Sequence, residues 1–383
     1  MGSFADLSTA DLGAHVAREL LSRARSQAKA DLAVTEVFMG NGRQAGGGPN
    51  VARQIAVRSG LSEEVPATTI NMACGSGLKS IALGADSIRL GINRAVLVGG
   101  AESMSGLPFM LPKMRRGYRL GHAPLVDGMY QDGFVCPLAD MVMGETAEKL
   151  AKDLGISRDE QDAFALASQN NAQAAIEAGR FADEIVPLEL PGKRGKPGDL
   201  VSADEHPRAN SSLAGLGKLP AVFDRENGSV TAGNSSGITD GASALLLMAE
   251  DACDELGLEP LAFVGDVRQA GVDPKVMGIG PVPATRRLEE ANGLGVGDYD
   301  LIELNEAFAA QVIACDRELK IPADRLNVNG GAISLGHPIG ATGARIVVTM
   351  LHELRRRGGK SGLATLCISG GMGLAAAFHR DAN

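Results

Sequence analysis

Cys74 is the first residue of this sequence whose type and surroundings could support catalysis. It stands between a β-type segment and an expected helix, and Gly75-Ser76-Gly77 follows it directly. A thiol at a helix N-terminus lies at the positive end of the helix dipole, which favours the nucleophilic thiolate. The small residues after it leave room for an acyl group. Because free cysteines are usually inert parts of a core, a buried structural role is the alternative.

His337 is the natural partner for such a nucleophile. It lies in the segment Gly336-His-Pro-Ile-Gly-Ala-Thr-Gly343, where Pro338 biases the histidine away from helical backbone. Imidazole titrates near neutral pH and is a common base for a cysteine nucleophile. The alternative is an ordinary loop histidine with satisfied hydrogen bonds.

Two further segments carry polar groups at the ends of expected strands. Cys367 is followed by Ser369-Gly-Gly-Met-Gly373, a turn whose backbone N–H groups could form an oxyanion pocket. Asn305 also follows a strand and could position a water molecule. Taken singly, Cys367 fits a structural cysteine and Asn305 fits a helix cap.

The composition excludes several other classes of function. The 383 residues carry a net charge of −9 and no Trp, which disfavours duplex binding and base-stacking platforms. The five cysteines are far apart and form no C-x-x-C, so neither a disulfide framework nor a zinc site is expected. The histidines share no short spacing with acids, and no metal site is predicted. No targeting segment or long apolar run is visible, which predicts a cytoplasmic protein that does not enter the membrane.

Strands alternate with helices along most of the chain, which predicts an α/β fold with mostly parallel sheet. The expected strands are 33–39, 66–72, 94–100, 301–305 and 326–329, followed by an antiparallel pair at 363–367 and 374–378. The expected helices are 8–25, 51–59, 78–91, 157–178, one opening at Glu306, and one near 341–357.

Two parts of the chain follow the same order of elements. A strand, Cys74, a glycine-rich turn, a helix and a strand ending Gly99-Gly100 are matched later by a strand, His337, a glycine-rich turn, a helix and a strand ending Gly370-Gly371. Two similar halves would bring Cys74 and His337 face to face. The residues between them, 105–237, are rich in Pro, Gly and charge and are expected to form an excursion above the sheets.

These motifs together resemble the thiolase family. The resemblance is carried by Asn71-Met-Ala-Cys-Gly-Ser-Gly77, Thr231-Ala-Gly-Asn-Ser-Ser-Gly237, Met277-Gly-Ile-Gly-Pro281, Asn305-Glu-Ala-Phe308, Gly336-His-Pro-Ile-Gly-Ala-Thr-Gly343 and Cys367-Ile-Ser-Gly-Gly-Met-Gly373. It extends from about residue 3 to 379, and the motifs occur in the family's order.

The resemblance implies a five-layer α/β/α/β/α sandwich of two βαβαβαββ halves. The N-terminal half would comprise 1–104 with 238–259, and the C-terminal half 260–383. The inserted loop domain, 105–237, would supply contacts to CoA and between subunits. Thiolases are dimers or tetramers, so a homo-oligomer is implied, with a homotetramer as the expected form.

The implied activity is that of an acetyl-CoA C-acetyltransferase, which interconverts two acetyl-CoA with acetoacetyl-CoA and CoA through an acetyl-cysteine. A degradative 3-ketoacyl-CoA thiolase acting on longer chains is the alternative. Claisen chemistry needs a nucleophile, two proton-transfer groups and two oxyanion sites. It requires neither a metal nor an organic cofactor, because coenzyme A is a substrate.

The resemblance also assigns roles to residues. Cys74 would be the acylated nucleophile, His337 its base and Cys367 the second acid/base, while Asn305 would hold a water that stabilises the thioester oxygen together with His337. Backbone N–H groups of Cys74 and Ser369 would form the other oxyanion hole. The expected CoA-contacting and pocket-lining residues are Arg208, Phe223, Ser236, Met277 and Phe308.

Two other functions are alternatives to a thiolase activity. A ketoacyl synthase has a related fold but lacks the second cysteine, so Cys367 and the segment Asn305-Glu-Ala-Phe308 argue against it. A truncated, weakly active CoA-binding protein is less consistent with four intact catalytic positions.

The sequence departs from the family's pattern in three places. Thiolases usually begin with an apolar strand before the first helix, and this chain starts after that point. With that strand taken as central in the N-terminal sheet, its loss would open the core, so a longer native protein or a misassigned start codon is predicted. Ser369 stands where Gly is commoner. Val142 replaces a His that is frequent in the biosynthetic type, which weakens a narrow assignment to acetoacetyl-CoA.

Overall fold

The computed structural model describes residues 2–192 and 197–381, and its N-terminal half is built on a four-stranded sheet. The strand order is β10-β3-β1-β2, with β10 antiparallel to β3 and the other pairs parallel. The strands are β1 (Glu36–Gly40), β2 (Ala67–Ile70), β3 (Ala95–Glu102) and β10 (Gly241–Met248). The helices of this half are α1 (Thr9–Gln27), α2 (Val51–Arg58), α3 (Ser76–Arg89) and α7 (Glu250–Leu256).

The C-terminal half repeats this plan with the order β11-β14-β13-β12, in which β12 and β13 are parallel. Its strands are β11 (Phe263–Gly271), β12 (Leu301–Leu304), β13 (Ser361–Ile368) and β14 (Met372–His379). The predicted antiparallel pair near the C-terminus is confirmed by β13 and β14. The helical segments are η2 (Pro274–Ile279), α8 (Pro281–Asn292), η3 (Val296–Asp298), α9 (Ala309–Leu319), α10 (Ala332–Leu335) and α11 (Ile339–Arg357).

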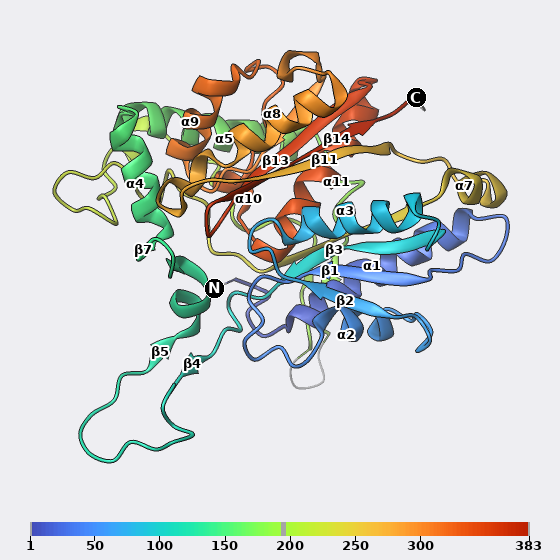
Figure 1. The fold of residues 1–383 in the computed structure, drawn as a ribbon, viewed down its shortest axis with the longest axis horizontal. Coiled ribbons are helices and arrows are strands. Elements are labelled where there is room, and N and C mark those ends of the chain that lie inside the picture. The colour runs from blue at the N-terminus through green and yellow to red at the C-terminus, as the bar shows by residue number, and fades with distance from the viewer. Residues whose placement is uncertain (1, 193–196, 382–383) are drawn as a thin grey trace.

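The two sheets enclose α3 and α11, and Figure 1 shows these helices between them. The core formed there includes Leu78 and Ile81 of α3, Val347 of α11, Val98 of β3 and Leu366 of β13. A second core lies between α1, α2 and the first sheet, and a third lies between α8, α9 and the second sheet. The predicted five-layer α/β/α/β/α sandwich is therefore confirmed.

Local sequence explains where the helices begin and end. Ser8 caps α1, with its hydroxyl accepting from the Asp11 N–H, and Leu12, Ala17 and Leu21 form the buried stripe. Helix α11 carries three arginines in its last turn and ends at Gly358, whose φ of 68° is a left-handed conformation that favours glycine.

The expectation that a missing first strand would open the middle of the N-terminal sheet is wrong. β10, β3, β1 and β2 are hydrogen-bonded consecutively, so the sheet has no gap. In the second sheet the first strand, β11, lies at an edge beside β14. By the internal repeat, the corresponding first strand of the N-terminal half would lie beside β10. That place is an edge of the sheet, so the absence of a strand there does not open the core.

The strand expected at 326–329 is also not formed, since only isolated bridges occur there. Asn327 has a φ of 44°. Its side chain accepts from the Leu304 N–H and donates to the Leu304 carbonyl, each at 2.9 Å. Backbone pairing of this segment with β12 is thus limited to Ile302, and at Leu304 the Asn327 side chain takes its place. The helix expected to open at Glu306 begins at Ala309 instead.

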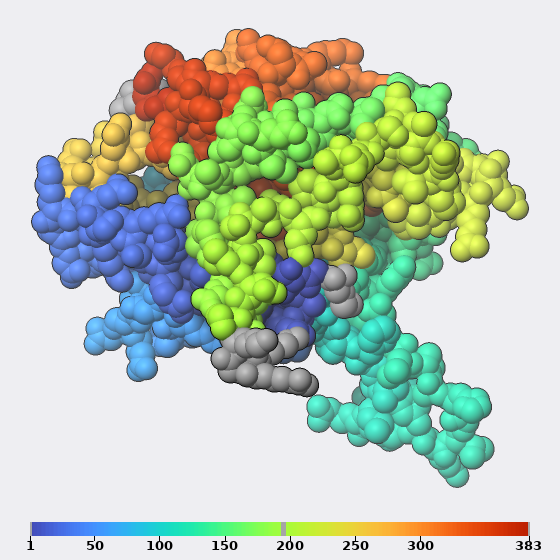
Figure 2. Space-filling view, turned by 180° about the vertical axis from the view of Figure 1, so that it is seen from behind, coloured from blue at the N-terminus to red at the C-terminus, as the bar shows by residue number. Residues whose placement is uncertain are grey.

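The middle of the chain lies over both halves, and a long arm projects from the body (Figure 2). The arm, residues 109–127, is a hairpin of β4 and β5. The segments of the middle region are β4 (Phe109–Met110), β5 (Val126–Asp127), η1 (Tyr130–Phe134), β6 (Val135–Cys136), β7 (Met141–Val142), α4 (Met143–Asp153), α5 (Arg158–Glu177), β8 (Leu188–Glu189), β9 (Leu200–Val201) and α6 (Leu213–Leu216). Helices α4 and α5 pack on α9 of the C-terminal half.

Candidate active site

Cys74 lies in a tight turn between β2 and α3. Ala73 has a φ of 44°, which is unusual for a residue with a side chain, and its N–H donates to Asn71 Oδ1 at 3.0 Å. The Met72 N–H donates to Ser76 Oγ at 2.8 Å. These bonds fix the turn and hold the thiol just before the first residue of α3.

The Cys74 sulfur lies 3.3 Å from His337 Nε2. The other ring nitrogen, Nδ1, lies 2.6 Å from Thr342 Oγ1. The Thr342 hydroxyl donates its proton to the Pro338 carbonyl at 2.9 Å, so it accepts from Nδ1. The proton of neutral His337 therefore lies on Nδ1, and Nε2 faces the thiol as an acceptor.

Burial dominates the ionisation of this pair. It raises the pKa of the Cys74 thiol, and the charge of Arg43 and the backbone N–H of Ser369 oppose that rise. The helix-dipole argument for a favoured thiolate is thus outweighed by desolvation. Burial, followed by the charges of Arg43 and Arg345, lowers the pKa of His337 to about 3. At neutral pH the resting pair is a thiol beside a neutral imidazole.

Cys367 is the last residue but one of β13 and is completely buried. It forms a cluster with Met277 and Ala307, against which Met143 and Phe308 pack. Burial raises the pKa of Cys367 well above its ordinary value, and the nearby Cys74 thiolate would raise it further. Two residues on, the turn brings the Ser369 N–H to Cys74, so the two cysteines share one site.

Asn305 is buried with no hydrogen-bond partner for either side-chain atom among the described residues. Its backbone N–H donates to the Thr365 carbonyl at 3.0 Å, which fixes it at the end of β12. A buried amide without partners is costly for folding. Such an amide is available to bind a water or a substrate oxygen.

Two buried residues that the sequence did not single out support the site. Glu102 ends β3 and accepts from the N–H groups of Gly42 and Gly340 at 2.9 and 2.8 Å. It thereby joins the N-terminal half to the first turn of α11. The other residue, Thr342, fixes the tautomer of His337. Glu102 lies at the end of a strand of otherwise apolar residues, which was the available signal.

A cavity of about 350 Å³ lies in the middle region, and Arg208 is among its lining residues. Its other lining residues are Gln169, His206, Asn210, Ser211, Ser212, Gly215, Leu216, Leu219, Ala232, Gly233 and Ile333. The Arg208 N–H donates to Gln169 Oε1 at 2.8 Å.

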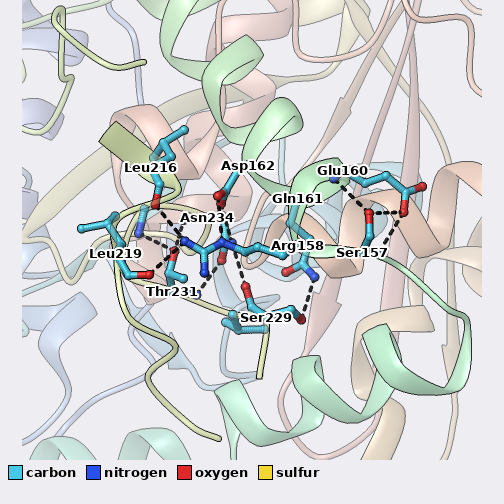
Figure 3. Close-up of polar contacts among 12 residues, drawn as sticks. Ser157, Arg158, Glu160, Gln161, Asp162, Leu216, Leu219, Ser229, Thr231 and Asn234 are labelled. Atoms are coloured by element: carbon cyan, nitrogen blue, oxygen red, sulfur yellow. Dashed lines mark hydrogen bonds and ion pairs between the residues drawn. The ribbon is translucent and has the colours of Figure 1, made fainter. Parts of the chain in front are cut away.

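A polar network around Arg158 includes two residues of the cavity lining, Leu216 and Leu219 (Figure 3). Arg158 donates to the carbonyls of Leu216 and Leu219 at 2.8 and 3.0 Å and pairs with Asp162 at 2.7 Å. Asp162 accepts from Asn234 Nδ2 at 2.9 Å. The network thus holds the segment with Leu216 and Leu219, and the loop with Asn234, against α5.

The other predicted CoA-contacting residues lie outside that cavity lining. The Ser236 N–H donates to the Ala307 carbonyl at 3.0 Å, which brings Ser236 beside the Asn305–Phe308 segment. Phe308 and Met277 border Cys367. Phe223 packs its ring on Gly144, where a Cβ would collide with it, and lines a separate shallow cavity beside α4.

Comparisons with known proteins identify the family of the chain. The family described as "Thiolase, N-terminal domain" matches residues 1–251, and "Thiolase, C-terminal domain" matches 258–380. An acetyl-CoA acetyltransferase of Pseudomonas aeruginosa is 51% identical over 380 residues, covering 99% of this chain and 95% of the relative.

Solved structures are similar as well. The Bacillus anthracis acetyl-CoA acetyltransferase superposes with a TM-score of 0.94 at 42% identity, over 99% of this chain and 94% of that one. Human mitochondrial 3-ketoacyl-CoA thiolase in complex with CoA gives a TM-score of 0.92 at 40% identity, over 99% and 93%.

Proposed function

The chain belongs to the thiolase family, and from this membership we propose that it is an acetyl-CoA acetyltransferase. The relative from Pseudomonas aeruginosa carries that name and is similar over nearly the whole of both chains. The observation that most supports the proposal is the meeting of Cys74, His337, Cys367 and the Ser369 N–H in one buried site.

In the first half-reaction, the Cys74 sulfur attacks the thioester carbonyl of acetyl-CoA while its proton moves to His337 Nε2. The carbonyl oxygen gains negative charge, which the N–H groups of Cys74 and Ser369 stabilise. The C–S bond to CoA breaks, and His337 returns the proton to the leaving CoA sulfur. The products are acetyl-Cys74 and CoA.

In the second half-reaction, the Cys367 thiol first gives its proton to His337, and the resulting thiolate removes a proton from the methyl carbon of another acetyl-CoA. Asn305, through a bound water, and His337 stabilise the enolate oxygen that forms. The enolate carbon attacks acetyl-Cys74, forming the new C–C bond and expelling the Cys74 sulfur. Acetoacetyl-CoA leaves, and the proton held by His337 restores the Cys74 thiol, while Cys367 keeps the proton taken from the methyl group.

We assign CoA binding to the cavity lined by Arg208 and, outside that lining, to Phe223, Ser236, Met277 and Phe308. A related human thiolase is described in complex with CoA. The cationic Arg208 suits the negatively charged phosphates of CoA. The proposed reaction needs no metal or organic cofactor, which stays a prediction.

The arm supports a homo-oligomer, with a homotetramer as the proposed form. Its apolar side chains Phe109, Met114, Leu120 and Leu125 are exposed, and Leu120 is 97% exposed. Such residues commonly mark a protein interface. Replacing residues 112–124 by a short Gly-Ser turn should lower the mass measured by light scattering. A full-length chain that is monomeric would contradict this.

The proposed location is the cytoplasm. All five cysteines are free, which suits a reducing compartment. Among the described residues, no helix has the length and apolar character needed to cross a membrane.

Degradative cleavage of longer 3-ketoacyl-CoA substrates is the second candidate. The observation in its favour is Val142, which stands where the biosynthetic type often has His. Comparing kcat/KM for acetoacetyl-CoA with that for longer 3-ketoacyl-CoA thioesters distinguishes the two. The acetyltransferase assignment predicts that acetoacetyl-CoA is preferred.

Trapping the acyl-enzyme tests whether Cys74 is the residue that becomes acetylated. After incubation with acetyl-CoA and acid quench, mass spectrometry of the digest should find one acetyl group on the Cys74 peptide. Cys74→Ala is the blank, and Cys253→Ala is the matched control at another half-buried cysteine. Acetylation elsewhere, or none on a folded protein, would overturn the proposal.

A further inference from the structure

Arg43 is a buried cation beside the proposed nucleophile. It follows β1 in the loop 41–44 and is only 6% exposed. The loop touches the turn that holds Cys74 and the start of α11, which follows His337. The Gly42 carbonyl accepts from Asn71 Nδ2 at 3.2 Å, and a Cβ at Gly42 would lie 2.9 Å from the Ile339 side chain.

The guanidinium of Arg43 has an unusual set of partners. Its Nη2 donates to the Gly133 carbonyl at 2.9 Å, whereas its buried Nε has no partner. It makes no ion pair with any residue of the described ranges 2–192 and 197–381. A buried charge without a carboxylate at contact distance costs folding free energy. Packing alone does not account for a guanidinium here.

The guanidinium also holds part of the middle region against the site. A Cβ at Gly133 would lie 2.8 Å from Arg43 Nε, so the absence of a side chain at Gly133 allows the close approach. Gly133 belongs to η1 (Tyr130–Phe134). At its other end, the Arg43 backbone N–H donates to Glu102 Oε1 at 3.2 Å, and Glu102 also binds the Gly340 N–H.

We propose that Arg43 is a positioning residue for the Cys74–His337 pair: it supplies a buried positive charge to the Cys74 thiolate and holds η1 through the Gly133 carbonyl. The inference rests on the proposed function, in which Cys74 is the nucleophile. It is distinct from the roles of Cys74, His337, Cys367 and Asn305, because Arg43 forms no bond to the reacting atoms.

The charges around the Cys74–His337 pair set the direction in which the pKa of Cys74 should change when Arg43 is replaced. The charge of Arg43 lowers the pKa of Cys74, against burial and against the Glu102 carboxylate. Arg43 and Arg345 also help burial to lower the pKa of His337, which keeps the imidazole neutral. Proton loss from Cys74 therefore depends on its burial, on the Ser369 N–H, and on the charges of Arg43 and Glu102, where burial raises the pKa of Glu102 to about 7.

The test is the pH dependence of Cys74 alkylation by iodoacetamide, followed by peptide mass spectrometry. A neighbouring opposite charge typically lowers an acid's pKa by about one unit or more. Arg43→Met should therefore move the alkylation midpoint of Cys74 to higher pH and slow alkylation about tenfold below it. Arg43→Lys, which keeps the charge, should restore much of the wild-type profile.

Two controls make the measurement specific. Cys253 is half-buried and is read in the same digest, and its alkylation should be the same in every variant. Arg53→Met is the matched variant, because Arg53 likewise donates to backbone carbonyls, those of Glu63 and Val65, but does not act on Cys74. It should leave the Cys74 profile unchanged.

Gly133→Ala is a second variant that tests the role of Arg43. Its added Cβ would displace the Arg43 guanidinium, while the positive charge stays in the chain. It should move the midpoint in the same direction as Arg43→Met, and it decides the question if Arg43→Met does not fold. A wild-type Cys74 profile in the folded variant would overturn the proposal. Alkylation requires no acyl-CoA, so failure of the acetyltransferase assignment would appear separately in the acetylation assay.

Discussion

Cys74 Sγ and His337 Nε2 lie 3.3 Å apart although 263 positions separate the two residues in the chain. Each precedes a central helix, α3 or α11, and the first turns of these helices are in contact. A Cβ at Gly77 would lie 2.7 Å from the Ala344 backbone nitrogen. The two halves therefore form one site at the place where their helix N-termini meet.

Thr342→Val tests how the orientation of His337 contributes to the reaction. Valine keeps the shape of threonine but leaves the Nδ1 proton of His337 without an acceptor. A buried unsatisfied donor costs about 1–3 kcal/mol, so kcat/KM for acetoacetyl-CoA should fall about tenfold or more. Thr342→Ser, which retains the hydroxyl, should stay close to wild type. Equal activity of Thr342→Val and Thr342→Ser would refute the role.

Asn305→Leu should separate stability from activity. Both polar atoms of Asn305 are buried without partners, so leucine removes about 1 kcal/mol or more of desolvation cost and Tm should rise or stay constant. Activity should fall by roughly a hundredfold or more because an oxyanion-stabilising group is lost. Thermal melting and steady-state kinetics on one preparation check both effects. A lower Tm with full activity would contradict this assignment.

Cys367→Ser should block one half-reaction and spare the other. In the proposed mechanism Cys367 moves a proton on the second substrate, whereas Cys74 and His337 carry out the acyl transfer. The variant should still acetylate Cys74 in a single turnover, while overall synthesis of acetoacetyl-CoA drops about a hundredfold or more. Quenched-flow mass spectrometry measures the first step. Cys315→Ser, at another fully buried cysteine, is the matched control. Loss of acetylation in a folded Cys367→Ser would argue against the division of roles.

Glu303 should make the protein less stable as pH rises. Burial raises the pKa of Glu303 to about 8 from an ordinary value of 4.5, although Arg345 opposes this. Between these values the folded chain holds a proton that the unfolded chain has released, so the free energy of unfolding falls with increasing pH. Each unit of pKa difference corresponds to about 1.4 kcal/mol.

Glu303→Gln removes this titration, so its stability relative to wild type should increase between pH 5 and pH 8. Urea unfolding at four pH values measures the difference. Glu226→Gln, at an exposed position, should give a constant difference. A parallel pair of curves for Glu303→Gln and wild type would show that Glu303 is ionised in the folded chain.

Much of this architecture could be predicted because the pattern is local. The turn after β2 combines Cys74 with small residues, and the segment around His337 combines glycines with a proline, so each indicates a turn that leads into a helix. The pairing of β13 with β14 follows from two apolar runs around Gly370 and Gly371. The repeat of these junctions then predicted that Cys74 and His337 meet.

What could not be predicted depends on contacts between distant segments. Sequence cannot tell that the carboxylate of Glu102 binds three backbone N–H groups, or that the Asn327 side chain bonds to the backbone of Leu304 in β12. From sequence alone, Arg43 cannot be distinguished from an ordinary loop arginine, because only the structure shows that it is buried. The order of strands in the first sheet likewise could not be predicted, because it depends on which strand edges remain free once the two halves have packed together.

The most direct test of the central claim is CoA-dependent cleavage of acetoacetyl-CoA by this chain, with Cys74→Ala as the blank. The proposed function predicts rapid release of acetyl-CoA by the wild type. It also predicts a folded Cys74→Ala protein, verified by circular dichroism, without measurable turnover. Cleavage that persists in Cys74→Ala, or a folded wild-type protein that neither cleaves acetoacetyl-CoA nor acetylates Cys74, would contradict the account.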